Sequence, residues 1–156
     1  MLTRSDAPWN FAFRSDPAKA GLCTIPLPSY AEFAHSAENL ALNGVYKFMS
    51  FGMELSTAAL EGIVAFIKDT YADIETYDIW FPHVASSELC RIAEESLGLH
   101  GKVYSDVFPR YGNLVSASIP AAMALAEVEQ KLHRGQRVVL CPASAGMGFG
   151  LADFVY

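Results

Sequence analysis

The amino-acid sequence predicts an α/β fold with a mixed, mainly parallel sheet, crossover helices and a C-terminal antiparallel strand. Short apolar runs alternate with segments of helical periodicity, and the last two runs are separated only by a loop of small residues. Strands that alternate with helices form parallel pairs, whereas two strands joined by a short loop are antiparallel. A length of 156 residues suits a single domain with its own core, so we expect residues 1–156 to form one domain.

The N-terminal segment is rich in proline. Residues 1–30 contain Pro8, Pro17, Pro26 and Pro28 between short apolar pieces. Proline is confined to edge strands, turns and loops, because it cannot donate to a hydrogen-bond ladder. We therefore expect loop with one or two edge strands, near Phe11–Phe13 and Leu22–Ile25.

The central segment predicts a helix, a buried strand and a second helix. Apolar residues recur at three-and-four spacing over Glu54–Tyr71, which is typical of an amphipathic helix. Asp78–Pro82 is a short apolar run ended by proline and favours a buried strand. Ser86 or Ser87 can cap a following helix that Gly98 ends.

The C-terminal segment predicts three more strands around one helix. Lys102–Phe108 and Arg137–Cys141 have the composition of strands, and so does Phe149–Tyr156. Ser118–Leu132 has helical periodicity, with Pro120 in its first turn, where proline is tolerated.

Composition and charge exclude several classes of function. There are 17 acidic and 11 basic residues, a net charge of −6, and the basic residues are scattered, which argues against nucleic-acid binding. No apolar run is long enough for a membrane span, and the N-terminus lacks a secretory signal. Cys23, Cys90 and Cys141 form no close pair, and the histidines lack metal-ligand spacing. We expect reduced thiols in a cytoplasmic protein and no metal site.

Two polar side chains follow predicted strands at the edge where ligands collect. His83 comes after the strand at 78–82, and Asn113 follows the strand predicted at 102–108. Ligands of open α/β sheets bind beyond the carboxyl ends of parallel strands. The two side chains could therefore donate hydrogen bonds to one anionic oxygen. From residue types alone, a structural histidine and a Gly-Asn turn are the more common interpretations.

Three linked stretches resemble a known family. IWFPHVASS, RYGNLVSASIPAAMALA and LHRGQRVVLCPASAGMGFGLADFVY are similar, in order and spacing, to the C-terminal half of the β-ketoacyl-[acyl carrier protein] synthase III family of thiolase-fold condensing enzymes. The step of 30 residues from His83 to Asn113 matches the family as well. The resemblance covers residues 77–156, with weaker support from the helix at 54–71, and implies half of a thiolase-like fold.

The resemblance also implies site residues and substrates. His83 and Asn113 correspond to the His and Asn of the family's Cys-His-Asn triad, which stabilises the enolate formed in decarboxylative Claisen condensation. Ala145 and Gly146 lie in the loop that supplies a main-chain oxyanion donor. Ala85 and Ser86 lie where the family binds pantetheine. The implied substrates are thioesters of coenzyme A or phosphopantetheine, in fatty acid or polyketide biosynthesis, with no permanently bound cofactor.

Departures from the family pattern shape the expected partners. The family's nucleophilic cysteine lies in an N-terminal half, so we expect that half, from the same gene or a separate chain, to complete the site. An uncovered apolar face would otherwise favour homo- or hetero-oligomers. Glu88 replaces a family arginine, which disfavours an acidic acyl carrier protein. Two alternatives remain open: a non-catalytic partner or binding subunit, and an acyltransferase that forms esters or amides on the same scaffold.

Overall fold

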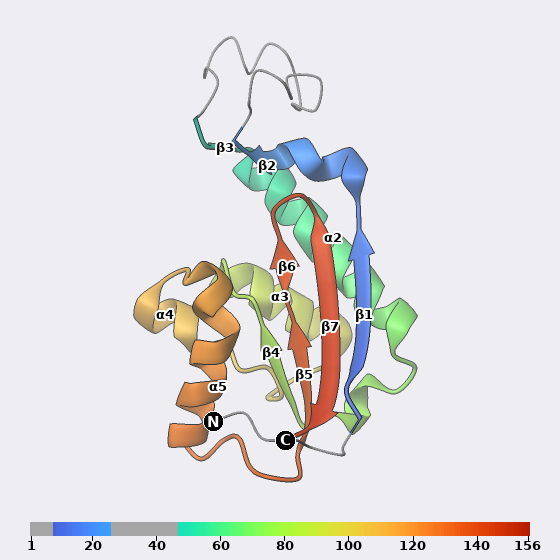
Figure 1. Cartoon of the computed structure of the whole chain (residues 1–156), viewed down its shortest axis with the longest axis vertical. Helices are drawn as coiled ribbons and strands as arrows, with labels where there is room; N and C mark the ends of the chain where they lie inside the picture. Colours follow the sequence, from blue (N-terminus) through green and yellow to red (C-terminus); the bar gives the residue numbers. More distant parts are fainter. Residues whose placement is uncertain (1–7, 26–46) are drawn as a thin grey trace.

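A computed structural model describes residues 8–25 and 47–156, and its main feature is a mixed five-stranded sheet (Figure 1). The strand order is β1-β7-β5-β4, with β6 paired to β7. The bounds are Asn10–Ser15 for β1, Ile79–Pro82 for β4, Arg137–Cys141 for β5, Ala143–Ser144 for β6 and Gly148–Val155 for β7. Residues 1–7 and 26–30 of the predicted proline-rich segment lie outside the described residues.

The α/β class and the mixed sheet are confirmed, but parallel pairing is less extensive than expected. Only β4 and β5 form a parallel ladder within the described chain, while β1, β5 and β6 all pair antiparallel with β7. The predicted C-terminal antiparallel strand is confirmed as β7. The parallel part of the sheet is small because the strand predicted at Lys102–Phe108 forms only a single bridge.

The two N-terminal strand predictions are both confirmed, in different sheets. The Phe11–Phe13 run lies in β1, the edge strand of the main sheet. Leu22–Ile25 contributes β2 (Cys23–Thr24), which pairs with β3 (Met49–Ser50) in a separate two-stranded sheet. A 3₁₀ helix, η1 (Pro17–Leu22), links β1 to β2.

Three of the four α-helices in the described chain, α2, α3 and α5, lie close to their predicted positions, whereas α4 was not predicted. Their bounds are Gly52–Thr70 for α2, Ser87–Leu97 for α3, Val107–Tyr111 for α4 and Ser118–Val128 for α5, with 3₁₀ turns η3 at Ile74–Thr76 and η4 at Val115–Ala117. The caps of α3 are as expected. Ser86 Oγ accepts a hydrogen bond from Leu89 N, and Gly98 takes a positive φ of 68°.

The strand predicted at Lys102–Phe108 is wrong. Val103 forms a single parallel bridge to Trp80, and α4 then begins at Val107. Tyr104 and Val107 are both buried, at the three-residue spacing of a helical turn rather than the two-residue alternation of a strand. The apolar residues of this segment are too few for their spacing to distinguish a strand from a helix.

The helix predicted at Ser118–Leu132 ends four residues early, at Val128. Gln130 has a positive φ of 57°, which ends the helix, and the N–H groups of Lys131 and Leu132 both donate to Ala126 O. This turn folds Leu132 back into the core. The apolar periodicity therefore continues past the end of the helix.

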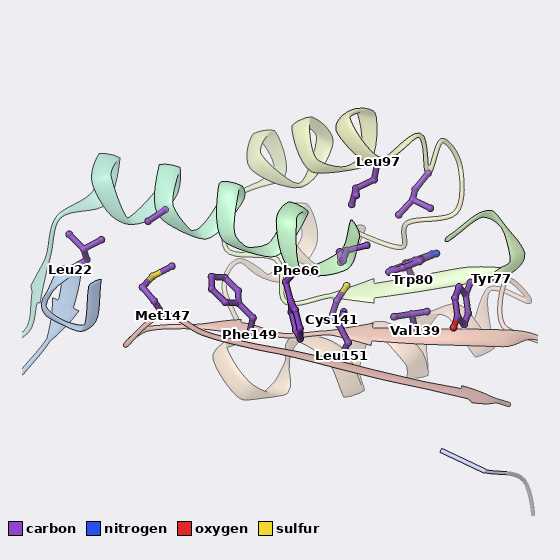
Figure 2. Close-up of a cluster of buried hydrophobic side chains, with 13 residues drawn as sticks. Leu22, Phe66, Tyr77, Trp80, Leu97, Val139, Cys141, Met147, Phe149 and Leu151 are labelled. Atoms are coloured by element: carbon purple, nitrogen blue, oxygen red, sulfur yellow. The ribbon is translucent and has the colours of Figure 1, made fainter. Parts of the chain in front are cut away.

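The strands of the parallel pair, β4 and β5, are buried on both faces. Trp80 and Val139 point toward α2 and α3, in the cluster that Figure 2 shows. Ile79, Phe81 and Val138 point to the opposite face, toward α4 and α5. The alternation of side chains along each strand thus divides the core into two layers.

The helices cover the two faces of the sheet unequally. Trp9 stacks on Phe154, which belongs to the α5 layer, and Phe11 and Phe13 continue this aromatic row along β1. Phe11 is 61% exposed and Phe13 is 78% exposed. The row Trp9, Phe11 and Phe13, called here the aromatic stripe, is therefore left largely open to solvent beside α5.

Gly62 lets α2 approach the sheet. A Cβ atom at this position would lie inside contact distance of the Phe149 ring, which is itself buried. We expect Gly62→Ala to lower the free energy of unfolding by about 1–3 kcal/mol, because this overpacking exceeds the gain in helix propensity. Urea denaturation measures the change.

Gly52→Ala, at the start of the same helix, is the matched control. A Cβ there has nothing within 4 Å, so this variant should be as stable as wild type or slightly more stable. Equal stability losses in both variants would show that the Phe149 contact is not the cause.

Candidate functional site

His83 lies immediately beyond β4, at the carboxyl end of the parallel β4–β5 pair. Its main-chain N–H donates to Cys141 O at 3.2 Å, which extends the ladder by one residue. Its Nδ1 is 3.1 Å from the hydroxyl of Ser118, which is 3% exposed at the first residue of α5. The imidazole is therefore held between a strand end and a helix start.

The environment of His83 favours its neutral form. Partial burial lowers the pKa of the imidazole from its ordinary value, and a hydrogen bond with the Val115 main chain opposes this only in part. At neutral pH the ring carries one N–H donor and one acceptor. It can therefore donate to an oxygen atom without carrying a charge.

Asn113 lies in the segment between α4 and α5, and its side chain is oriented by the main chain. Its Oδ1 accepts a hydrogen bond from Val115 N at 2.8 Å. An N–H group needs an acceptor, so this contact fixes the carbonyl of the amide and leaves the NH₂ group as the free end. Val115 has a positive φ of 53°, which is unusual for a β-branched residue. Such strained residues cluster at functional sites.

One cavity of about 880 Å³ joins most of the predicted site residues. Its lining includes His83, Asn113, Ala85, Ser86 and Ala145. The structure thus places the two polar side chains and the predicted pantetheine residues on one continuous surface. The volume lies in the range typical of sites for small molecules.

Gly146 does not line this cavity, although its neighbour Ala145 does. The two residues lie in the turn between β6 and β7, where Gly146 and Met147 have positive φ values of 81° and 52°. Two consecutive positive values are typical of tight hairpin turns. Of the two predicted loop residues, only Ala145 therefore reaches the described lining of the cavity.

The three cysteines also line the cavity, but two of them are poor nucleophiles. Burial raises the pKa of Cys90 to about 11 and raises the pKa of the fully buried Cys141 as well. Both thiols are therefore protonated at neutral pH, and the thiolate is the reactive form. Cys90 and Cys141 serve as small apolar wall residues.

The described part of the chain contains neither a cluster of metal ligands nor a membrane-spanning helix. Residues 8–25 and 47–156 hold no group of three or more His, Cys, Asp or Glu side chains that could bind a metal ion. Within the same ranges, no helix combines the length and apolar character required to cross a membrane.

Sequence reasoning missed two residues that position the site. Ser118 contacts the imidazole, and Val115 fixes the amide. Ser118 belongs to the Ser-Ile-Pro stretch that carries the family resemblance, so its position in a motif was the available signal. Nothing in the sequence marks Val115, because a positive φ at valine is not encoded in its residue type.

More than half of the chain matches the model of a known protein family. The family described as 3-oxoacyl-[acyl-carrier-protein (ACP)] synthase III C terminal matches residues 68–154. Two curated relatives, both β-ketoacyl-[acyl-carrier-protein] synthase III, match over a longer range. The protein of Porphyra umbilicalis is 29% identical over 87% of this chain and 38% of its own length. The protein of Clostridium perfringens is 27% identical over 89% of this chain and 43% of its own length.

Solved structures show the same fold. The 3-oxoacyl-[acyl-carrier-protein] synthase III of Aquifex aeolicus VF5 superposes with a TM-score of 0.77 at 20% identity, covering 99% of this chain and 47% of that one. The chain thus spans less than half the length of these relatives. The predicted half of a thiolase-like fold is confirmed.

We expect His83 to titrate below its unperturbed pKa of about 6.5, because its neutral form is favoured in the folded chain. Below pH ~6.5 the unfolded chain binds more protons than the folded chain, so stability should fall as the pH is lowered through this window. NMR titration of the imidazole and thermal unfolding between about pH 5 and 7 measure the two effects.

His83→Gln is the control for this titration, since it removes the ionisable group. The pH dependence of stability in this window should be weaker in the variant. An imidazole that titrates above its value in the urea-unfolded chain would contradict the assignment.

Proposed function

The chain belongs to the 3-oxoacyl-[acyl-carrier-protein] synthase III C-terminal family, and on this premise we propose that it supplies the His and Asn of a condensing active site. An N-terminal thiolase-fold half, in the same polypeptide or in a separate chain, supplies the nucleophilic cysteine. The reaction is the decarboxylative Claisen condensation of an acyl thioester with a malonyl thioester.

The proposed reaction has two stages. The partner's cysteine thiolate attacks the acyl thioester, forms a new thioester with the enzyme and releases the first thiol. The malonyl thioester then loses its carboxylate as carbon dioxide, and the electron pair of the broken bond forms an enolate. The enolate carbon attacks the acyl carbonyl, and the cysteine leaves as a thiolate.

One observation carries this proposal: two uncharged hydrogen-bond donors, His83 and Asn113, line the same cavity. The enolate oxygen is the atom on which negative charge develops. Donors fixed in advance lower the barrier because they need not reorganise during the reaction. The hydrogen bonds to Ser118 and from Val115 N hold the two groups in place.

The entrance residues bear on the thioester carrier. Ala85 and Ser86 line the cavity beside His83, where the pantetheine arm would pass. Nearby, Glu88 is exposed and pairs with Arg91 at 2.6 Å, a contact that also lowers the pKa of the Glu88 carboxyl. Arg91 thus forms ion pairs with both Glu88 and Glu95. It therefore offers little unpaired positive charge to an acidic carrier protein. This favours coenzyme A thioesters.

The aromatic stripe and α5 provide a surface for the N-terminal half. Between Ser118 and Ala126, α5 carries no charged residue, and Val128 at its end is 80% exposed. A helix that is apolar on all sides is normally buried. We infer that the other half of the fold covers α5 and the aromatic stripe together.

We expect His83→Ala and Asn113→Asp each to reduce turnover about 100- to 1,000-fold, the cost of losing one oxyanion donor. Asn113→Asp keeps the oxygen that accepts from Val115 N but loses the donor. The assay combines the chain with a cysteine-bearing N-terminal half and follows carbon dioxide release from malonyl-coenzyme A.

His133→Ala is the matched control, because this histidine is exposed and does not line the cavity. Wild-type turnover in all variants would remove the proposed roles. Thioester binding with no turnover even in the wild-type pair would instead support the non-catalytic binding subunit.

Phe13→Asp should weaken the association with the N-terminal half at least about tenfold, since large aromatic residues dominate interface energies. In isolation, the same variant should reduce self-association. Analytical ultracentrifugation measures both. Thr57→Asp, which adds a charge on the exposed side of α2, should change neither. A wild-type chain that remains monomeric and does not bind the N-terminal half would argue against this interface.

A further inference from the structure

We propose that Glu129 is a positioning residue for the proposed condensation: from the end of α5, its side chain holds α4 and thereby the Asn113 amide that follows α4. This inference rests on the proposed function and deepens it, because it assigns a residue outside the cavity to the placement of one hydrogen-bond donor. Glu129 is absent from the described lining of the cavity, so it acts only through other residues.

The carboxylate of Glu129 collects three donors. Its Oε1 accepts a hydrogen bond from Arg110 of α4 at 2.5 Å. Its Oε2 accepts from the hydroxyl of Tyr104 at 3.0 Å and lies 3.0 Å from Lys131 Nζ. The hydrogen bonds from Lys131 and Arg110 lower the pKa of the Glu129 carboxyl to about 2. The carboxylate therefore stays charged at neutral pH and keeps all three contacts.

Asp106 closes these contacts into a network. Its Oδ2 lies 3.1 Å from Lys131 Nζ and 3.6 Å from the Arg110 guanidinium. Lys131 Nζ also lies over the ring of Tyr104, 5.1 Å from its centroid, and Tyr104 is only 4% exposed. An isolated ion pair at the surface contributes little, whereas several charges that share partners hold one geometry more firmly. The buried ring ties this network to the core.

The position of α4 depends on contacts with α5, which lies beside it (Figure 1). A helix of five residues is too short to be stable on its own. Its buried residue is Val107, at the first position, in the same core cluster as Ala122 of α5. Residues 109–113 are all exposed. The end of α4 nearest Asn113 is therefore held by Arg110, whose side chain reaches the end of α5.

The connection from Arg110 to Asn113 is short and tightly turned. The Gly112 N–H donates to Phe108 O at 2.8 Å, and Gly112 has a positive φ of 74°, which glycine adopts readily. Asn113 follows directly, and its Oδ1 accepts from Val115 N. A movement of the end of α4 is therefore passed to the amide within three residues.

The two donors of the proposed site are thus related through one helix. The first residue of α5, Ser118, contacts the His83 imidazole at 3.1 Å, and Glu129, directly after the last residue, holds α4. A helix keeps its two ends at a fixed separation, with a rise of about 1.5 Å per residue. Because fixed donors are effective only at the position where charge develops, α5 sets the placement of Asn113 relative to His83.

The first test uses the chain alone and does not depend on turnover. Glu129→Gln keeps the size of the side chain but removes its charge, so the ion pairs with Arg110 and Lys131 are lost. The Val115 amide proton, which the Asn113 carbonyl protects, should then exchange with solvent at least about threefold faster, as measured by NMR. Thermal unfolding shows whether the variant is folded. An unchanged exchange rate in the folded variant would overturn the proposal.

Asp69→Asn is the matched control. It removes another exposed ion pair, with Arg14, on the α2 side of the sheet, and should leave the exchange of Val115 unchanged. An equal increase in this control would show that any loss of a surface ion pair has the same effect, and would count against Glu129.

Arg110→Gln removes the same contact from the side of α4, which keeps the test valid if Glu129→Gln does not fold. Because both changes break one contact, the double variant should exchange no faster than either single variant. Increases that add in the double variant would show that the two residues act separately, and would overturn the link from Glu129 to α4.

A second measurement connects this placement to the reaction. With the N-terminal half present, Glu129→Gln should lower carbon dioxide release from malonyl-coenzyme A about ten- to hundredfold, since small misplacements of a reacting group are costly. Transfer of the acyl group to the partner's cysteine, followed by mass spectrometry, should keep its wild-type rate, because Asn113 acts only in the second stage. Equal losses in both stages would overturn the positioning role. Faster exchange at Val115 in a system with no turnover at all would retain the link from Glu129 to Asn113 and remove only the condensing function.

Discussion

The parallel pairing of β4 with β5 is the constraint on which the rest of the structure depends. Both strands are buried on two faces, so their side chains must alternate between two apolar layers. A shift of one residue would exchange Trp80 with Phe81 and place each in the wrong layer. The pairing also ends where Pro82 meets Cys141, and this fixes His83 at the edge of the sheet. The register of β4 against β5 therefore determines both which side chains fill the core and where His83 lies.

The site lies where the two helical layers meet beyond this edge. From one layer, α5 presents Ser118 to the imidazole, and the segment before it carries Asn113. From the other, α2 and α3 contribute apolar side chains to the lining of the same cavity. This arrangement explains why a single cavity combines two fixed donors with walls that are almost entirely hydrocarbon.

Sequence patterns predicted the elements with strong periodicity and placed His83 at the end of a strand, but they placed Asn113 after a strand where the structure has the helix α4. The stripe of α2, the caps of α3 and the β-branched run of β5 are local signals, and each was recovered. The segment from Lys102 was mistaken for a strand because two short apolar pairs, Val103-Tyr104 and Val107-Phe108, fit either period. The positive φ of Val115 and the contact between His83 and Ser118 depend on tertiary packing, which no local pattern encodes.

The unequal coverage of the sheet links the fold to its partner. On the α2 side, two helices cover the strands and leave only a ligand-sized space. On the α5 side, the helices cover β4 and β5, whereas the aromatic stripe on β1 stays exposed. An exposed aromatic row is costly in water, and stacking within the row removes only part of that area. A partner that covers the stripe therefore lies on the same face of the sheet as α5, whose Ser118 contacts His83.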